Sequence, residues 1–353
     1  ILTQKYDVVC TNPPYMGGSG MNATLSDFIK KNYPDYKSDL FSAFVVKCTK
    51  MAKLEGYLGF LTPYVWMFIQ SYEKMRNYIY STRTIETLIQ FEYSAFEEAT
   101  VPICTFVLKN SKVRKNGAYL RLTEFRGGME VQRQKALEAI SNHKCGFYYE
   151  SNAENFSKIP GSPVAYWVSE NFVRAFEQGE LLTSLAPTRK GMFTGDNNLW
   201  LKLWHEIEYN KMFYQFKPYN KGGEFNKWYG NHDYVVNWKN DGKDIKSFKG
   251  SGNINESLFF RHCITWSLIT SSKLSFRAII DNYHVMGDAG PIACADDNKL
   301  FYILGVLNSK FIEEVASIVA PTLNCSNGVA GTFPIIVDEI NKPTTDNIVQ
   351  ENI

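Results

Sequence analysis

The order of apolar and polar positions in the first third of the chain predicts alternating strands and helices. Residues 6–11 form a short apolar run rich in β-branched side chains, which is typical of a buried parallel strand. Residues 38–54 carry apolar side chains at helical spacing, with Ser38 in the position of an N-cap and Gly56 just beyond the last turn. Residues 56–63 are predicted to form the next strand.

The alternation continues with a predicted helix at residues 72–81 and predicted strands at residues 85–91 and 101–108. Such a series indicates an α/β fold with an open sheet, in which ligands bind at the carboxyl ends of the strands. The two prolines that follow the first predicted strand therefore lie where a functional site is expected.

The pattern changes further along the chain. Residues 111–162 are polar and charged, and we interpret them as a peripheral insertion or connector. From about Val164, aromatics and glycines interleave with Lys and Asn, and turn signals separate short apolar runs. We therefore divide the chain into residues 1–110, a connector at 111–162, and a mixed α+β domain at 163–353. A late helix is predicted at residues 300–319, with these residues on one face: Leu304, Leu307, Phe311, Val315.

The composition is that of a globular protein with a sizeable core. Of the 353 residues, 44% are hydrophobic and 15% are aromatic, which is enough for two domains. No apolar run approaches the roughly 18 residues that span a bilayer, and no signal segment opens the chain. We therefore expect no membrane partner and a cytoplasmic location.

Neither the cysteines nor the histidines are spaced as metal ligands. The seven cysteines occur singly, without a C-x-x-C pair, and the simplest interpretation is a reducing cytosol and no bound metal. We interpret the five histidines as structural or surface residues: His143, His205, His232, His262, His284.

The net charge of +2 hides an uneven distribution. Residues 189–277 contain 14 Lys and Arg against 8 Asp and Glu, whereas residues 278–353 contain 3 against 10. The overall charge does not indicate a nucleic-acid binder, but the basic part of the chain lies in the middle of its second half.

The motif Asn12-Pro13-Pro14-Tyr15 carries the most chemical information. The exocyclic amine of adenine is a poor nucleophile because its lone pair is delocalised into the ring. If the Asn12 side-chain oxygen and the Pro13 carbonyl each accept one amine hydrogen, the lone pair turns toward a methyl donor, and both acceptors stabilise the positive charge that develops. The fixed φ of proline aims the Pro13 carbonyl.

Tyr15 would supply a flat face for a base that has been flipped out of the duplex. The alternative is that the motif is only a proline turn after a strand, because short motifs have false positives. Its position between an apolar strand and a glycine-containing loop, at residues 16–22, favours the catalytic interpretation.

These residues resemble the N-P-P-Y class of amino-methyltransferases, and more closely the adenine-specific PglX methylases of BREX phage-defence systems and the methylase subunits of restriction enzymes. The resemblance covers nearly the whole chain. It rests on YDVVCTNPPYMGG, KNYPDYKSDLFSAF, GYLGFLTPYVWMF, FEEATVPICTFVLK, TGDNN, KPYNKGGEFNKWYGN and RHCITWSLITS. The first of these is widely shared, and the aromatic–basic segment is more specific.

The resemblance implies a DNA adenine-N6 methyltransferase that uses S-adenosylmethionine, acts at a defined site in double-stranded DNA, and works beside other defence or restriction–modification subunits. It implies that residues 1–110 are the C-terminal part of a Rossmann-like methyltransferase sheet and that residues 163–353 are a target-recognition domain. Catalysis would then fall to Asn12, Pro13, Pro14 and Tyr15.

The chain departs from this family in its cofactor loop. The family carries an F-x-G-x-G loop before the N-P-P-Y strand, and the sequence has none; residues 281–290 offer a glycine-containing alternative, but Pro291 follows and no helix signal does. Since the chain starts at Ile1, a few residues before the first strand, we expect the main cofactor contacts upstream and weak cofactor binding by this part alone.

Three segments of the second domain combine cations, aromatics and glycines, a combination suited to phosphate and base-edge contacts. The alternative is a solvated loop with buried aromatics. The candidate DNA-binding residues are Arg189, Lys190, Lys217, Tyr219, Asn220, Lys221, Lys227, Trp228 and Tyr229, with Arg261 and Arg277 of lower weight.

Two other functions stay open at this stage. The same acceptor geometry suits a protein amide or an RNA base, although such enzymes rarely carry a long aromatic–basic domain. The chain could also belong to a recognition subunit without catalysis, against which the intact Asn12 and Tyr15 argue.

Overall fold

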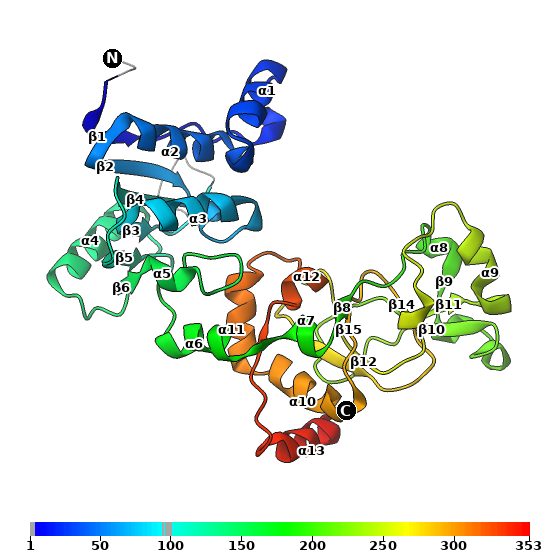
Figure 1. Cartoon of the computed structure of the whole chain (residues 1–353). Coiled ribbons are helices and arrows are strands. Elements are labelled where there is room, and N and C mark those ends of the chain that lie inside the picture. The colour runs from blue at the N-terminus through cyan, green and yellow to red at the C-terminus, as the bar shows by residue number, and fades with distance from the viewer. Residues whose placement is uncertain (1–3, 94, 96–100) are drawn as a thin grey trace. The chain divides into compact units, whose positions relative to one another are not determined.

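The computed structural model describes residues 4–93, 95 and 101–353, which divide into two compact units, Ile1–Arg174 and Ala175–Ile353 (Figure 1). Residues 96–100, the start of the FEEATVPICTFVLK segment, lie outside the described residues. Each unit is described by itself.

Unit 1 is built on a six-stranded mixed sheet with the order β1-β2-β4-β3-β5-β6. β1 and β2 are parallel, as are β3 and β5, whereas β4 is antiparallel to β2 and β3, and β6 to β5. The carboxyl ends of β1, β2, β3 and β5 therefore share one edge. The strands are β1 (Tyr6–Thr11), β2 (Ala52–Pro63), β3 (Thr84–Gln90), β4 (Ile103–Lys109), β5 (Asn116–Arg121) and β6 (Tyr148–Asn152).

The predicted α/β alternation is present, with small shifts at the element ends. Helix α2 begins after Asp39, whose carboxylate accepts a hydrogen bond from the Phe41 amide, so the N-cap is Asp39 and not Ser38. The helices of the unit are α1 (Ala23–Asn32), α2 (Leu40–Met51), α3 (Glu73–Thr82), α4 (Gly128–Ser141), α5 (Ala153–Phe156) and α6 (Glu170–Gln178), the last of which crosses the boundary between the units.

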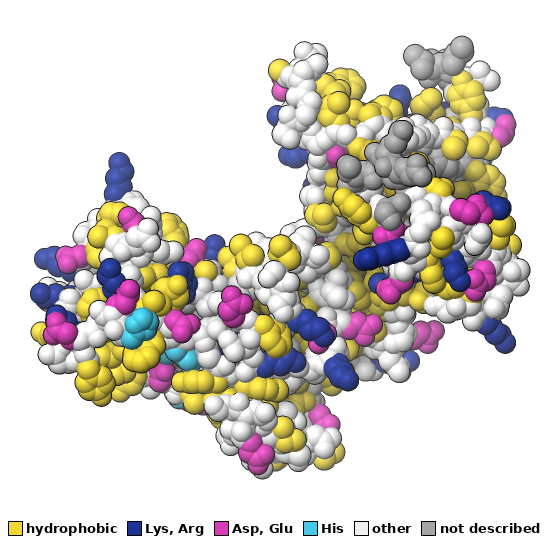
Figure 2. Space-filling model, turned by 180° about the vertical axis from the view of Figure 1, so that it is seen from behind, with side chains coloured by type: hydrophobic (Ala, Val, Ile, Leu, Met, Phe, Trp, Pro, Cys, Tyr) yellow, Lys and Arg dark blue, Asp and Glu magenta, His cyan; other side chains and the backbone are white. Residues whose placement is uncertain are grey.

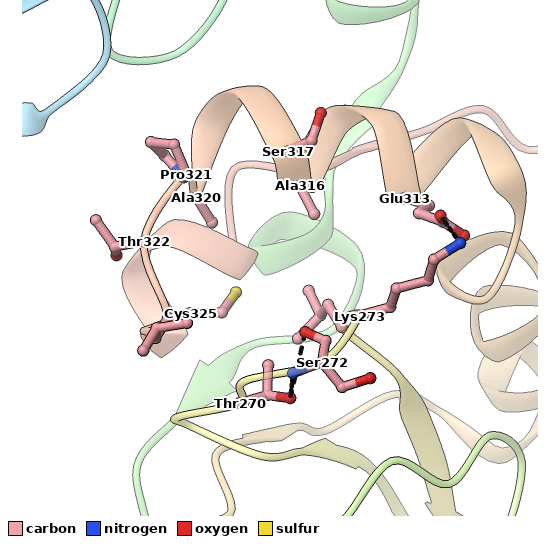
Figure 3. A pocket seen from close by; sticks show the side chains of 12 residues that line it. Thr270, Ser272, Lys273, Glu313, Ala316, Ser317, Ala320, Pro321, Thr322 and Cys325 are labelled. Carbon is pink, nitrogen blue, oxygen red and sulfur yellow. Dashed lines mark hydrogen bonds and ion pairs between the residues drawn. The ribbon is translucent and has the colours of Figure 1, made fainter. Parts of the chain in front are cut away.

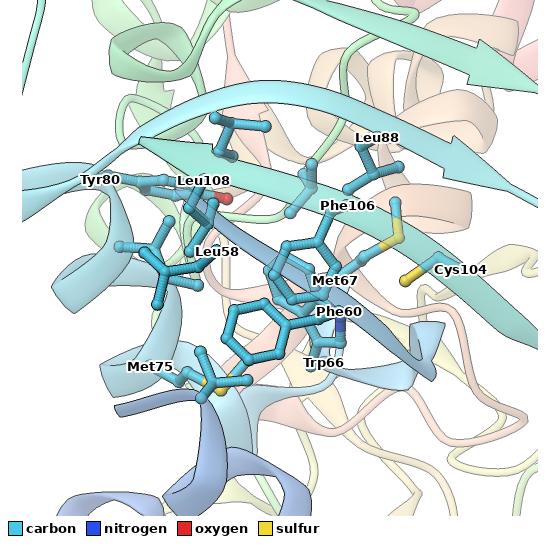
Figure 4. Close-up of a cluster of buried hydrophobic side chains, with 14 of the residues drawn as sticks. Leu58, Phe60, Trp66, Met67, Met75, Tyr80, Leu88, Cys104, Phe106 and Leu108 are labelled. Carbon is cyan, nitrogen blue, oxygen red and sulfur yellow. The ribbon is translucent and has the colours of Figure 1, made fainter. Parts of the chain in front are cut away.

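The core of unit 1 lies against β2 and β4 (Figure 4). Leu58 and Phe60 on β2 alternate with less buried neighbours, and the Phe60 ring meets Phe106 of β4 at 5.1 Å between centroids. Trp66 lies 5.0 Å from Phe106 and is fully buried. Because each such side chain contributes roughly 1.5–3 kcal/mol on burial, this cluster fixes the sheet that carries the site.

β1 is not the buried strand that its apolar sequence predicts. Val8 is 62% exposed and Cys10 is also exposed. The reason is its place in the sheet: among the described residues, β1 has a strand neighbour on one side only. An apolar, β-branched run has the sequence pattern of a buried strand, but at the edge of a sheet it is less covered by neighbouring elements.

The polar segment expected to form a connector instead contributes to the sheet. β5 pairs with β3, and β6 pairs with β5, so residues 111–162 supply two of the six strands. α4 has a weakly apolar face and buries Gln132 and Ala139. The polar composition reflects the edge position of β6 and the exposure of α4.

Unit 2 contains two four-stranded sheets, with the orders β14-β10-β11-β9 and β13-β12-β15-β8, and a two-stranded sheet of β16 and β7. Its strands are short: β7 (Glu180–Leu181), β8 (Thr188–Arg189), β9 (Leu201–Leu203), β10 (Phe216–Asn220), β11 (Tyr234–Asn237), β12 (Cys263–Trp266), β13 (Phe276–Ile279), β14 (Val285–Met286), β15 (Ile292–Ala293) and β16 (Pro334–Ile335). Its helices are α7 (Leu182–Leu185), α8 (Asn197–Trp200), α9 (Lys239–Ser247), α10 (Asp297–Leu307), α11 (Lys310–Val319), α12 (Asn327–Ala330) and α13 (Lys342–Asn352).

The single helix predicted at residues 300–319 is two helices, α10 and α11, separated at Asn308. Ser309 caps α11 by accepting a hydrogen bond from the Ile312 amide. The Asn308 side chain bonds both the amide and the carbonyl of Phe276, at 3.0 and 2.9 Å. A tertiary contact thus stabilises the break, while the apolar face continues through Leu304 and Val315, both buried.

Candidate functional site

Asn12 and Pro13 directly follow β1 at the carboxyl edge of the sheet. The last paired residue of the strand is Thr11, which lies opposite Phe60 of β2. Asn12 is exposed, whereas Pro13 is buried. The rigid ring is therefore anchored in the protein, and the amide of Asn12 is left open to a ligand.

The Tyr15 side chain is held against Asn12. Its hydroxyl donates to Asn12 Oδ1 at 2.8 Å and lies 3.1 Å from the Leu61 carbonyl oxygen. The ring meets the edge of Phe41 at 6.4 Å between centroids, and Tyr15 stays 37% exposed. Burial raises the pKa of Tyr15, so the hydroxyl is a neutral donor at neutral pH.

The loop after Tyr15 is fixed to the start of α2. The Met16 amide donates to Asp39 Oδ1 at 2.9 Å, and the Leu40 amide donates to the Met16 carbonyl at 3.0 Å. Asp39 therefore serves both as the cap of α2 and as the anchor of this loop. Phe41, on the first turn of α2, supports the Tyr15 ring, so the start of one helix holds both Tyr15 and the loop that follows it.

The same sheet edge carries polar residues that the sequence pattern did not single out. Gln90, the last residue of β3, is buried and accepts a hydrogen bond from the Tyr166 hydroxyl at 3.0 Å. The guanidinium of Arg121, the last residue of β5, lies 4.4 Å from the Trp167 ring centroid. Position at a strand end was the only available signal, because both partners are more than 40 residues away in sequence.

Within the described part of the chain, no group of three or more His, Cys, Asp or Glu side chains is arranged to hold a metal ion. The seven cysteines are free thiols. Among the described residues, no helix is both long and apolar enough to cross a membrane.

Two of the candidate DNA-binding residues are interior residues, which corrects the prediction. Tyr219 is buried, its hydroxyl donates to the Met192 carbonyl at 3.1 Å, and burial raises the pKa of Tyr219. Asn220 is buried and its amide donates to Thr265 Oγ1 and to the Gly290 carbonyl, both at 2.8 Å. Neither side chain is available to a groove.

Arg189, Lys190 and Tyr229 are exposed. The Lys190 ammonium lies 3.9 Å from the Asp288 carboxylate, a distance at which an exposed pair contributes little. Tyr229 is 47% exposed, and its ring lies 4.5 Å from that of His232.

The other candidates are partly buried. The ammonium groups of Lys217 and Lys221 lie 5.8 and 3.8 Å from the ring centroids of Phe260 and Tyr234. Lys227 donates to the Asn308 carbonyl at 3.0 Å. Trp228 is bound to β13 through its main chain. These four residues pack against the unit as well as face solvent.

The lower-weight candidates also differ from one another. Arg277 is 1% exposed, and burial lowers its pKa to about 10. Its guanidinium lies 3.4 Å from the Asn226 carbonyl and 3.4 Å from Ser267 Oγ, so Arg277 is an interior residue. Arg261 is exposed. On the face shown in Figure 2, basic side chains are interspersed with acidic and apolar ones.

A cavity of about 270 Å³ in unit 2 does not include any candidate residue (Figure 3). It lies between the 270–274 segment and α11, and the Lys273–Glu313 ion pair closes one end.

The comparisons with known proteins concern both units. Residues 1–96 match the family described as Eco57I restriction-modification methylase. The adenine-specific methyltransferase PglX of Lacticaseibacillus casei (strain Zhang) is 34% identical over 95% of this chain, which covers 30% of that protein. The adenine-specific methyltransferase BrxX of Escherichia coli O9:H4 (strain HS) is 33% identical over 95% of this chain, which covers 28% of that protein.

Solved structures agree on the fold. The Type IIL restriction-modification enzyme MmeI in complex with DNA matches with a TM-score of 0.61 at 13% identity, over 97% of this chain and 48% of that one. The Type ISP enzyme LlaBIII bound to DNA matches with a TM-score of 0.51 at 10% identity, over 98% of this chain and 29% of that one. The chain spans less than a third of the length of PglX and BrxX. Over 95% of its own length, it is homologous to these adenine-specific methyltransferases.

Proposed function

We propose that the intact protein methylates N6 of adenine at a specific site in double-stranded DNA, within a phage-defence or restriction–modification system. The observation that carries this proposal is the Asn12–Tyr15 geometry: an exposed asparagine, a buried proline and a partly exposed aromatic ring at the carboxyl edge of an α/β sheet. The homology to PglX and BrxX supports the reaction and the substrate class.

In this proposal, Asn12 Oδ1 and the Pro13 carbonyl accept the two hydrogens of the adenine amine. The nitrogen becomes more tetrahedral, its lone pair is freed from the ring, and the oxygens stabilise its growing positive charge. The proton then leaves to solvent after the methyl group has bound. Tyr15 stacks on the flipped base, and Phe41 keeps its ring in place.

S-adenosylmethionine would supply an electrophilic methyl group. The residues present fit the acceptor side of this reaction, because Asn12 is exposed at the edge where ligands of α/β sheets bind. The sequence has no F-x-G-x-G loop, so we assign the main cofactor contacts to residues of the intact protein outside these 353.

We propose that unit 2 reads the DNA. The basic excess of residues 189–277 and the exposure of Arg189, Lys190 and Tyr229 support this role. The structures of MmeI and LlaBIII, which match both units, hold DNA. Arg189, Lys190, Lys217, Lys221, Lys227, Trp228 and Tyr229 stay candidates for contact. Since the proposed substrate is chromosomal or phage DNA, the proposed compartment is the cytoplasm.

The test is long-read sequencing of native DNA from cells that carry the intact protein or its Asn12→Ala variant, with N6-methyladenine scored by sequence context. We expect one motif to be methylated with the wild-type protein and not with Asn12→Ala, while DNA affinity in vitro stays nearly the same. Loss of DNA binding with retained methylation would contradict the assignment. Unchanged methylation would direct attention to RNA or protein substrates.

A further inference from the structure

The segment at residues 222–233, here called the 222–233 loop, has an unusual backbone. Gly223 and Gly230 have φ values of 140° and 122°, which only glycine adopts easily. Trp228 and Asn231 also have positive φ, at 72° and 62°. A large aromatic residue in this region is strained, and such strain persists only when surrounding contacts enforce it.

Hydrogen bonds attach this loop to β13 and brace it internally. The Trp228 amide donates to the Phe276 carbonyl at 3.0 Å, and the Ala278 amide donates to the Trp228 carbonyl at 2.7 Å. Within the loop, the Asn226 side-chain amide donates to Asn231 Oδ1 at 2.7 Å. These bonds supply the contacts that hold the strained backbone in place.

Three side chains joined in series by hydrogen bonds lie at the end of the loop. Asp281 Oδ1 lies 2.8 Å from His284 Nδ1, and His284 Nε2 lies 2.9 Å from His232 Nδ1. The Tyr283 amide also donates to Asp281 Oδ1, at 2.9 Å, which fixes the carboxylate. His284 is 3% exposed and His232 is partly buried, so the two rings lead from the interior toward the surface.

The carboxylate fixes where the hydrogen lies in the first of these two bonds. Since Asp281 can only accept, the hydrogen of the first bond lies on His284 Nδ1, and in the second bond one of His284 Nε2 and His232 Nδ1 donates to the other. Burial, followed by the neighbouring His284, lowers the pKa of His232 to about 4, so the ring is neutral at neutral pH.

Beyond His232, this series of side chains is continued by the ring of Tyr229. The His232 ring lies 4.5 Å from the Tyr229 ring, and Tyr229 is half exposed next to the strained Trp228. The three groups lie in series and do not converge on a metal position, and no metal-binding group of three or more such side chains exists among the described residues. The function that this arrangement fits is mechanical support of an exposed aromatic ring.

We propose that Asp281, His284 and His232 are positioning residues that hold Tyr229 in the orientation in which it contacts a base or sugar of the recognised DNA site. This inference rests on the proposed DNA-reading function of unit 2. A preformed aromatic contact adds specificity, because little side-chain freedom is left to lose on binding.

The test uses the intact protein and two DNA duplexes, one with the methylated motif found by sequencing and one without it. His284→Leu removes both hydrogen bonds at similar size, and His284→Gln keeps one donor and one acceptor. The matched control is His262→Leu, which breaks another His–Asp contact in unit 2, the 2.9 Å contact of His262 with Asp297.

We expect His284→Leu to lower the ratio of target to non-target affinity at least about fivefold, with non-target affinity and its salt dependence unchanged. His284→Gln should restore most of the ratio, and His262→Leu should not change it. Tyr229→Ala should lower the ratio similarly, and adding His284→Leu to it should cause little further loss.

Equal losses for both duplexes, an unchanged ratio in His284→Leu, or fully additive effects with Tyr229→Ala would each overturn the inference. If His284→Leu does not fold, the same test is made with His232→Asn, which changes the partly exposed member of the Asp281–His284–His232 series. A wild-type protein that neither methylates nor binds DNA would contradict the proposed function itself, whereas a specific wild-type protein with insensitive variants would contradict only the positioning role.

Discussion

The Asn12 side-chain oxygen accepts the Tyr15 hydroxyl hydrogen in this structure. A carbonyl oxygen has two lone pairs, so the same atom can also accept an amine hydrogen of adenine. The hydroxyl thereby fixes the amide orientation in which the Asn12 oxygen points toward Tyr15, and in the proposed reaction its second lone pair would accept from the adenine amine. In the proposed mechanism, Tyr15 would both stack on the base and orient the Asn12 amide.

Tyr15→Phe should separate these two roles. The ring would remain, and the bond to Asn12 would be lost at a cost of about 1 kcal/mol, the usual net value of one hydrogen bond. We expect a fivefold to tenfold fall in the single-turnover methylation rate, with DNA affinity unchanged, and a much larger fall for Tyr15→Ala. Equal losses in the two variants would show that the hydroxyl, not the ring, is the important part.

The exposed cations of unit 2 should act by binding DNA phosphates. Arg189→Ala combined with Lys190→Ala should weaken DNA binding and reduce the slope of log affinity against log salt by about 0.9 for each phosphate that is no longer neutralised. Lys239→Ala, an exposed lysine outside the candidate set, is the control. An unchanged slope would exclude this pair from the interface.

Lys221 and Lys227 differ from that exposed pair in their packing. Lys221→Ala with Lys227→Ala should also weaken binding in a salt-dependent way, but Lys227 donates to the Asn308 carbonyl, so this double change should lower stability as well. Measuring DNA binding and thermal unfolding on the same samples separates the two effects. A loss of stability with full DNA affinity would assign both lysines to packing alone.

At the residue scale, the sequence predicts short motifs better than it predicts the hydrogen-bond partners of buried side chains. Asn12–Tyr15 could be located because a strand, two prolines and a loop follow one another directly. Asn220 lies between Tyr219 and Lys221 in sequence, which suggests that it is a surface residue. Its side-chain amide instead donates hydrogen bonds to Thr265 and Gly290 inside the unit. Those partners are 45 and 70 residues away, and local pattern carries no information about them.

At the scale of elements, the His232–His284 contact makes stability depend on pH. The pKa of His232 is lowered to about 4 by burial, and then by His284 and Arg277, while Asp281 and Asp233 oppose the shift. Between about pH 6.5 and pH 4, the unfolded chain binds more protons than the folded one, so stability falls as the pH falls through this range.

Thermal unfolding between pH 7 and pH 5 checks this sign. We expect the unfolding temperature of unit 2 to fall by a few degrees toward pH 5, and the fall to be smaller in His232→Gln, whose amide does not titrate. His143→Gln, at an exposed position in unit 1, is the control. A wild-type protein and His232→Gln with the same pH dependence would contradict the assignment.

Elements were predictable where periodicity alone defines them. β1, α2, β2, α3, β3 and β4 follow the predicted order because their apolar spacing is local, whereas α1 (Ala23–Asn32) was not predicted. The break between α10 and α11 was missed because both helices continue one apolar face, and the side chain that stabilises the break bonds Phe276, which is distant in sequence. The N-cap shifted by one residue because Ser38 and Asp39 are both good caps, and it is the Asp39 carboxylate that accepts from the helix.

At the scale of the whole molecule, the boundary was harder to predict than the fold class. The α/β sheet and the change of composition in the second half are visible in the sequence, but β5 and β6 are polar enough to resemble a connector. Sheet membership depends on pairing between distant segments, and a polar edge strand gives no apolar alternation to detect.

Among the residues that the structure describes, β1 pairs with a strand on one side only, which has a consequence for samples in solution. A β-branched edge strand with an exposed Val8 is a template for pairing with another chain. Concentrated samples of these 353 residues should therefore self-associate, as sedimentation velocity would show, and Val8→Lys should suppress the association. Ile140→Lys, at an equally apolar and exposed position on α4, should not; if it does, general hydrophobicity and not strand pairing drives the association, and solubility screens should target the surface as a whole.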